Sequence, residues 1–256
     1  MKSASRIALA AIVLGVVMAA AAIGVNLRRT PAAEDVEQNE LPKGAKYLAG
    51  YGPKRYSQFA EEWIIRDFFK DKRNGIFVDV GANHYRDHST TFYLEESLGW
   101  SGLAVEPLVQ FADDYKKYRP RTRFLPFFVS DASDETAKMY VLDKHTVVSS
   151  FDRKFTERTG SNPREITVPT ITMNDLLTKN GIEKFDLLSM DIELSEPKAL
   201  AGFDITRFQP ELVCIEAHSE VRQQILDYFA RHGYVIVGKY LPADDHNLYF
   251  TPLRRD

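Results

Sequence analysis

The sequence predicts an α/β domain, built as a mainly parallel sheet with helices on both faces. Short apolar segments rich in β-branched residues alternate along the chain with segments whose apolar residues recur at helical spacing. This alternation is typical of strand–helix–strand units, which place their strands side by side in one sheet. The chain has 256 residues, 44% of them hydrophobic and 27% charged, which is sufficient for one sizeable hydrophobic core.

The N-terminal region differs from the rest in composition. Residues 7–25 form a run of about 19 apolar or small residues, a length that can cross a bilayer as a helix. We therefore predict a membrane anchor in residues 1–29, with a cleavable signal peptide as the alternative because small residues offer cleavage sites. Basic residues flank the run almost equally and give no firm orientation. Residues 30–46 are polar and contain proline, which predicts a flexible linker, and the folded domain is expected at residues 47–256.

The first half of the domain contains three expected helices and three expected strands. Segment 56–70 has one apolar face at helical spacing. The run "GIFVDVG" at 75–81 is short, apolar and ends in glycine, as expected for a strand covered on both faces. Ser89 and Gly99 are suited to begin and end a helix. The expected helices are 56–70, 89–98 and 108–118, and the expected strands are 75–81, 101–107 and 122–131.

The second half repeats this rhythm after an interruption. Residues 138–170 contain extended pieces and a polar loop, and we interpret them as an insertion over the active-site edge of the sheet. The single cysteine, Cys214, excludes an intrachain disulfide and is interpreted as a buried apolar side chain. Strands are expected at 184–193, 211–218, 234–240 and 246–252, and helices at 196–203 and 220–233.

Polar residues stand where two of these strands end. Parallel sheets bind ligands beyond the carboxyl ends of their strands, and Asp79 and Gly81 lie at such an end. Glu106 ends the next strand, where an acid can accept hydrogen bonds from two ribose hydroxyls. A nucleoside cofactor is therefore expected. The glycine is followed by "ANHYRD", which lacks the remaining glycines of a pyrophosphate-binding loop, so S-adenosylmethionine fits better than NAD.

Several motifs together resemble the FkbM family of S-adenosylmethionine-dependent methyltransferases. They are "YSQFAEEWII", "FVDVGANH", "STTFYLEESLGWSGLAVEP", "LLSMDIELSEPKALAGFD" and "PELVCIEAH", and the resemblance covers roughly residues 56–250. It implies a Rossmann-like class I methyltransferase with a seven-stranded sheet, acting mostly on hydroxyls of sugars or secondary metabolites. It also implies a ribose contact at Glu106, an adenine contact near Asp131, and further cofactor contacts at Asp79, Gly81, Ala82 and Asn83.

The sequence departs from the family pattern at two places. Many relatives have a glycine soon after Gly-Ala-Asn, where this chain has "HYRDHS". Many also have D-x-E-G-x-E where this chain has "DIELSE", so that Leu194 stands in place of a small residue. The second departure would narrow the acceptor pocket or mark a degenerate enzyme.

Acidic residues and a histidine are expected to converge at two neighbouring strand ends. Asp191 and Glu193 are two residues apart and share one side of a strand, and Glu216 and His218 repeat this spacing on the following strand. We predict these four residues to be catalytic, one of them as the base that accepts the hydroxyl proton. The same groups could bind a metal ion, but no motif requires one and none is predicted.

The expected function is transfer of a methyl group from S-adenosylmethionine to a hydroxyl of a carbohydrate, glycolipid or secondary metabolite. A nicotinamide-dependent oxidoreductase is one alternative, disfavoured by the missing glycines, and a non-catalytic cofactor-binding module is another. A net charge of −3 argues against a nucleic-acid partner. Supply of S-adenosylmethionine favours a cytoplasmic domain behind a single-pass anchor, whereas cleavage of a signal peptide would make the protein secreted. The sequence does not define the acceptor or the oligomeric state.

Overall fold

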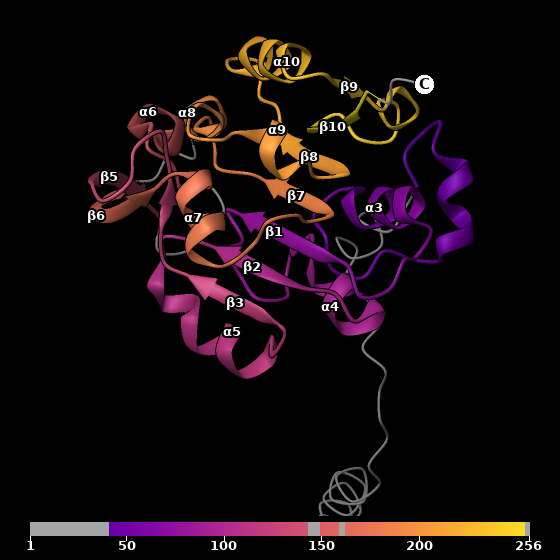
Figure 1. Cartoon of the computed structure of the whole chain (residues 1–256), viewed down its shortest axis with the longest axis horizontal. Coiled ribbons are helices and arrows are strands. Elements are labelled where there is room, and N and C mark those ends of the chain that lie inside the picture. The colour runs from indigo at the N-terminus through magenta and orange to yellow at the C-terminus, as the bar shows by residue number, and fades with distance from the viewer. Residues whose placement is uncertain (1–40, 143–148, 159–161, 254–256) are drawn as a thin grey trace, which may run out of the picture. The chain divides into compact units, whose positions relative to one another are not determined.

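The computed structural model describes residues 41–142, 149–158 and 162–253. Its main sheet has seven strands and is shown in Figure 1. The strands are β1 (Ile76–Val80), β2 (Ser101–Val105), β3 (Thr122–Leu125), β7 (Leu187–Met190), β8 (Leu212–Glu216), β9 (Tyr234–Ile236) and β10 (Asn247–Pro252). Their order is β3-β2-β1-β7-β8-β10-β9, and β10 is antiparallel to both of its neighbours. The predicted mainly parallel, seven-stranded sheet is confirmed.

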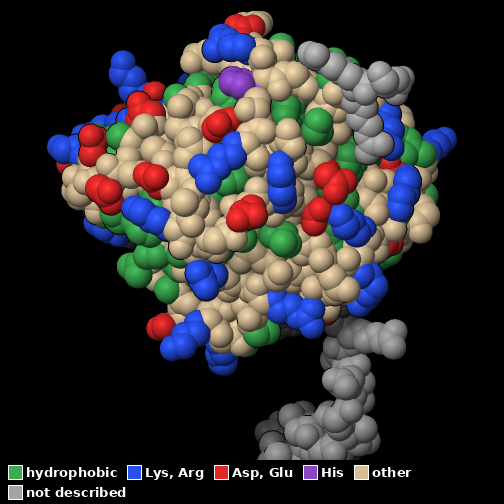
Figure 2. Space-filling model, viewed as in Figure 1, with side chains coloured by type: hydrophobic (Ala, Val, Ile, Leu, Met, Phe, Trp, Pro, Cys, Tyr) green, Lys and Arg blue, Asp and Glu red, His purple; other side chains and the backbone are tan. Residues whose placement is uncertain are grey.

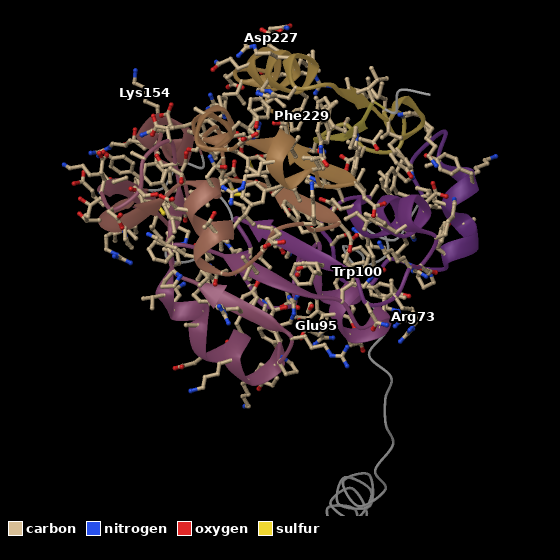
Figure 3. The ribbon with its side chains drawn as sticks, viewed as in Figure 1. Arg73, Glu95, Trp100, Lys154, Asp227 and Phe229 are labelled. Carbon is tan, nitrogen blue, oxygen red and sulfur yellow. The ribbon has the colours of Figure 1, made fainter. Side chains whose placement is uncertain are left out.

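Helices cover both faces of this sheet, as predicted. One face packs against α3 (Glu61–Phe69), α4 (Phe92–Leu98) and α5 (Ala112–Tyr118). The other face packs against α7 (Met173–Lys179), α8 (Glu196–Ala201), α9 (Ile205–Phe208) and α10 (Arg222–Arg231). In β1 successive side chains alternate between the two layers, because Phe77 belongs to the first core and Val78 to the second. Figure 3 shows Phe229 of α10 directed toward the sheet and Asp227 directed away from it.

A smaller sheet lies beside the main one and carries the predicted insertion. It consists of β4 (Phe128–Val129), β5 (Thr136–Val141) and β6 (Arg164–Ile171), in the order β4-β6-β5. The expected third strand, 122–131, is therefore two strands: β3 stays in the main sheet, whereas β4 pairs with β6. Short helices complete the described residues: η1 (Lys46–Tyr51), η2 (Val109–Phe111), α6 (Arg153–Glu157) and η4 (Gly238–Tyr240).

Packing of the domain begins slightly before the predicted boundary at residue 47. Ala45 is fully buried, and Leu41 packs against the core that α3 helps to form. The predicted anchor in residues 1–29, with its apolar run at 7–25, lies outside the described residues and stays a prediction. Among the helices of residues 41–142, 149–158 and 162–253, none has the length and apolar character needed to span a bilayer.

Charged side chains are mixed on the surface that Figure 2 shows. Acidic and basic groups alternate across this face of the described domain, and neither sign gathers into a continuous patch. Such a surface carries no strong field of one sign on this side. The acidic residues that matter for the site are instead gathered at the ends of β7 and β8, where most of them are buried.

Candidate active site

Two adjoining cavities open at the carboxyl ends of β1, β2, β7 and β8, where the sequence predicted a ligand. The larger cavity has a volume of about 250 Å³ and the smaller about 40 Å³. Gly81, Asn83, Asp191 and Glu193 line both, so the two form one bent cleft. The larger cavity is also lined by Asp79, Ala82, Glu216 and His218, and the smaller one by Glu106.

Asp79 is a buried acid that joins β1 to the segment before α4. Its carboxylate accepts a hydrogen bond of 2.7 Å from the Thr91 hydroxyl. Thr91 also accepts one of 3.2 Å from Arg119, which forms a buried ion pair with Glu95 of α4. Burial raises the pKa of Asp79, although the Thr91 hydrogen bond and the Arg119 charge oppose that shift. The predicted cofactor residue therefore has a structural role in addition to facing the larger cavity.

The expected helix at 89–98 begins later than predicted, and its first amides are already bonded. The Ser89 hydroxyl accepts hydrogen bonds from the backbone N–H groups of Thr91 and Phe92. Helix α4 starts only at Phe92 and ends, as predicted, at Gly99, which has a left-handed backbone. The amide of Phe92, the first residue of α4, is therefore not free for a ligand.

Gly81 is required by the close approach of a neighbouring strand. Its φ is +85°, a conformation that strongly favours glycine. A Cβ atom at this position would lie 1.7 Å from the backbone oxygen of Asp191. The loop after β1 and the end of β7 are thus in direct backbone contact. Gly81 also lines both cavities, and its expected contact with the cofactor stays a prediction.

Glu106 connects the ends of β1 and β2. One carboxylate oxygen accepts a hydrogen bond of 3.1 Å from the Asn83 amide, and the other accepts one of 2.9 Å from the Leu108 amide. Burial raises the pKa of Glu106 to about 7. Each oxygen retains a second lone pair that a ribose hydroxyl could use. Next to Asn83, Ala82 packs against Tyr115, whose hydroxyl donates to the Ala82 carbonyl.

An apolar slot in the smaller cavity was not predicted residue by residue. Phe128 of β4 stacks on Phe151 with ring centroids 3.6 Å apart, and Met139 of β5 lines the same space. The Ser149 hydroxyl is buried there and has no hydrogen-bond partner within the described ranges. Three of these residues come from the segment that the sequence analysis placed over the active-site edge, and that placement is confirmed.

Asp131, the expected adenine contact, does not line either cavity. It accepts a hydrogen bond from Ser130 and lies 3.6 Å from the amino group of Lys198. The physical reason is the departure of β4 from the main sheet, because residues after β4 follow the smaller sheet. The structure therefore does not bring Asp131 together with the other predicted cofactor residues.

The predicted acidic cluster forms as expected. His218 Nε2 lies 3.2 Å from Glu193 Oε2 and 3.1 Å from Glu216 Oε2. Burial, with repulsion from neighbouring carboxylates, raises the pKa of Glu193 to about 9 and that of Glu216 to about 11. Glu196, at the start of α8, has its pKa raised to about 7, mainly by burial. Near neutral pH, Glu193 and Glu216 therefore hold protons, which a positive charge bound beside them would displace.

Asp191 differs from the rest of the cluster in its access to solvent. It is exposed, whereas Glu196 and Glu216 are buried. Protein nevertheless surrounds the Asp191 carboxyl, which raises its pKa. The exposure of Asp191 and the raised pKa of its carboxyl are compatible, because Asp191 lines the two cavities and water reaches it there. Among the four predicted catalytic residues, it is the one that a bound ligand meets most directly.

The family departure at "DIELSE" coincides with an unusual backbone. Glu193 and Leu194 both have positive φ, at +53° and +74°. The Ser150 hydroxyl donates a hydrogen bond of 2.7 Å to the Glu193 carbonyl and holds this turn. Glycine adopts such angles without strain, which explains why many relatives have glycine where this chain has Leu194. The turn forms here without it, and Leu194 packs on the core instead of narrowing either cavity.

Aromatic rings from distant segments complete the larger cavity. Phe59 stacks on His246 with centroids 3.8 Å apart, and Phe155 meets His218 edge to face at 5.2 Å. These partners could not be paired from the sequence, because about 190 residues separate Phe59 from His246. Two histidines lie in the loop between β1 and α4. His88 lines the larger cavity, whereas His84 accepts hydrogen bonds from its own turn.

A seven-stranded sheet with one antiparallel strand, and acids at the ends of β1 and β2, define a Rossmann-like class I methyltransferase. A family model named Methyltransferase FkbM domain matches residues 79–236. The chain belongs to this family, and it is an S-adenosylmethionine-dependent methyltransferase. A search among curated proteins found no match.

Solved methyltransferase structures resemble the chain weakly. A TehB-like SAM-dependent methyltransferase from Corynebacterium glutamicum has a TM-score of 0.44 and 16% identity, over 81% of this chain and 93% of that one. A SAM-dependent O-methyltransferase from Thermotoga maritima has a TM-score of 0.43 and 10% identity, over 79% of this chain and 68% of that one. The assignment rests on the family model and the sheet order.

Proposed function

We propose that the protein methylates a hydroxyl group on a carbohydrate, glycolipid or secondary metabolite. The observation that carries this proposal is Asp191, an acid that lines both the larger cavity and the smaller cavity beside Glu106. Transfer to a hydroxyl requires a group that accepts a proton, whereas transfer to an already anionic or basic acceptor does not. The acids and aromatic rings of the larger cavity also suit a polar acceptor with hydroxyls.

The residues of the cleft fit S-adenosylmethionine. Glu106 would accept hydrogen bonds from the ribose hydroxyls, and the adenine would lie against the apolar wall that Phe128, Met139 and Phe151 form. The unpaired Ser149 hydroxyl offers a polar contact at the same place. Bound there, the donor supplies an electrophilic methyl group on a sulfonium.

The side chains of the larger cavity would hold the acceptor in line with the methyl group. Methyl transfer is an in-line displacement, so positioning of the acceptor oxygen contributes much of the rate. Phe59 and His246 provide a flat wall for the acceptor, and Asp191 receives the hydroxyl proton.

Methyl transfer from labelled S-adenosylmethionine to fractionated cell glycans and lipids tests the proposal. We expect label in an ether-linked methyl group that resists mild alkali. Label only in esters or amines would contradict hydroxyl methylation. Thermal-shift titration with S-adenosylhomocysteine and with NADH distinguishes the proposed methyltransferase from the oxidoreductase alternative. Binding of S-adenosylhomocysteine without transfer to any fraction would favour the non-catalytic module.

The affinity for the cofactor should depend on pH through Glu106. Its pKa is raised to about 7, and only the ionised carboxylate accepts from both ribose hydroxyls. Affinity should therefore rise with pH, and S-adenosylhomocysteine should bind about tenfold more tightly at pH 8 than at pH 6. Calorimetry at both pH values measures this change.

Two variants give this measurement its control. Glu106→Gln should weaken binding by about tenfold to a hundredfold at pH 8 and should remove most of the pH dependence. Glu135→Gln changes an exposed glutamate outside both cavities and should behave like the parent. An unchanged pH profile in Glu106→Gln would show that another group is responsible.

The membrane location and the partners of the protein are proposals as well. We infer a single-pass anchor at residues 7–25 and a domain on the cytoplasmic side, because S-adenosylmethionine is made there. Protease digestion of intact cells tests this orientation. Digestion of the domain under these conditions would place it outside.

A further inference from the structure

Three potential metal ligands from two strand ends meet in the larger cavity. His218 Nε2 lies 3.2 Å from Glu193 Oε2 and 3.1 Å from Glu216 Oε2, and the ligand atoms of all three residues lie within 4.8 Å of one another. Adjacent ligands of an octahedral ion with bonds of about 2.1 Å are about 3.0 Å apart. The two measured separations match this spacing.

Hydrogen bonding satisfies only some of the carboxylate oxygens in this cluster, although the Asp191 and Glu216 carboxyl groups hydrogen-bond to each other. His218 Nε2 and Glu193 Oε2 are hydrogen-bonded to each other at 3.2 Å. Glu216 is only 8% exposed, and its Oε2 has no hydrogen-bond partner within the part of the chain described, although His218 is near. Burial of a carboxylate oxygen without a hydrogen-bond partner is unfavourable.

A second unsatisfied oxygen lies at the same place. Glu196 is fully buried, and its Oε1 accepts a hydrogen bond of 2.9 Å from the Ile192 amide. Its Oε2 has no partner within the described residues. Glu196, Glu216 and Asp191 also offer ligand atoms within 4.8 Å of one another. Glu216 thus belongs to two overlapping sets of ligands, and both sets point to a positive charge between them.

The cluster has no cationic partner among the lysines and arginines of the described residues. Within the described part of the chain, the ion pairs of these four carboxylates involve His218 and no lysine or arginine. Buried carboxylates are normally paired with a cation or coordinate a metal. Several carboxylate oxygens with one imidazole suit Mg²⁺ or Mn²⁺ better than a thiolate-preferring metal.

We propose that Glu193, Glu216 and His218 bind one Mg²⁺ or Mn²⁺ ion in the larger cavity, with Asp191 and Glu196 around it. This departs from the sequence analysis, which predicted no metal. The remaining ligand positions face the cavity, where water or an acceptor oxygen can occupy them. Coordination would lower the pKa of an acceptor hydroxyl and fix its direction. This catalytic role rests on the proposed hydroxyl methylation, but binding of the ion does not.

Binding of Mn²⁺ to the purified full-length protein, measured by electron paramagnetic resonance without donor or acceptor, tests the site. We expect one Mn²⁺ per chain, displaced by excess Mg²⁺. Glu216→Gln and His218→Asn should each weaken binding by about 100-fold. Asp245→Asn is the matched control, because Asp244, Asp245 and His246 form a separate and partly exposed set of potential ligands. It should bind Mn²⁺ like the parent.

The outcomes separate this site from the proposed function. No Mn²⁺ binding by the parent, or loss of binding in Asp245→Asn but not in Glu216→Gln, would overturn the site. Affinity for S-adenosylhomocysteine, measured on each variant, shows that the variant is folded. If Glu216→Gln does not fold, His218→Asn gives the answer. Bound Mn²⁺ in a protein that methylates no hydroxyl would leave the site intact and refute the function.

Discussion

Replacing Asp191 with asparagine should lower the rate of methyl transfer by roughly 10²- to 10⁴-fold, the usual range for loss of a general base. Asparagine has nearly the same shape but cannot take up the acceptor proton. Asp191 lines both cavities and is exposed, so in the proposed reaction it would lie between donor and acceptor. Single-turnover kinetics with saturating donor and acceptor measure this step directly.

Two controls support the interpretation of Asp191→Asn. Calorimetry with S-adenosylhomocysteine should show a much smaller change in affinity than in rate. Asp227→Asn makes the same chemical change on the outer side of α10, where Figure 3 shows the side chain directed away from the sheet, and should leave the rate unchanged. A parental rate in Asp191→Asn would assign the base to another residue, with His218 and His88 the next candidates in the cavity.

Gly81→Ala should destabilise the fold and weaken cofactor binding together. The new Cβ would overlap the Asp191 carbonyl, at a φ that disfavours alanine. The left-handed backbone and the overlap should together cost about 2 to 5 kcal/mol of unfolding free energy. For a domain of this size, that corresponds to a fall in Tm of roughly 5 to 15 °C. Thermal unfolding and calorimetry with S-adenosylhomocysteine measure both effects.

Gly238→Ala is the matched control for this substitution. A Cβ at Gly238 would meet no atom within 4 Å, and its backbone is not left-handed. We expect a change within about 0.5 kcal/mol and parental cofactor affinity. Equal stability of Gly81→Ala and Gly238→Ala would contradict the backbone contact between the β1 loop and β7.

The sequence was sufficient to predict the sheet and the acids at its edge. Apolar periodicity distinguishes strands from helices, and the rules for parallel sheets place Asp79, Glu106, Asp191 and Glu216 at one edge. These rules depend on local pattern and topology, so they hold without knowledge of side-chain packing. The convergence of Glu193, Glu216 and His218 was predictable for the same reason.

Contacts between distant segments could not be predicted in this way. Nothing in the local pattern indicates that β4 leaves the main sheet, and the position of Asp131 depends on that departure. The stacking of Phe59 on His246 likewise depends on how the residues just before α3 pack against the loop before β10. The left-handed backbone at Leu194 was hidden because leucine is not a residue that normally indicates it.

The wall shared by the two cavities has a kinetic consequence. Gly81, Asn83, Asp191 and Glu193 line both spaces, so a bound donor completes the surface that the acceptor meets. The donor should therefore bind first and the methylated product should leave before S-adenosylhomocysteine. By linkage, each substrate also increases the affinity for the other. Product-inhibition patterns in the steady state would then show S-adenosylhomocysteine competing with the donor and not with the acceptor.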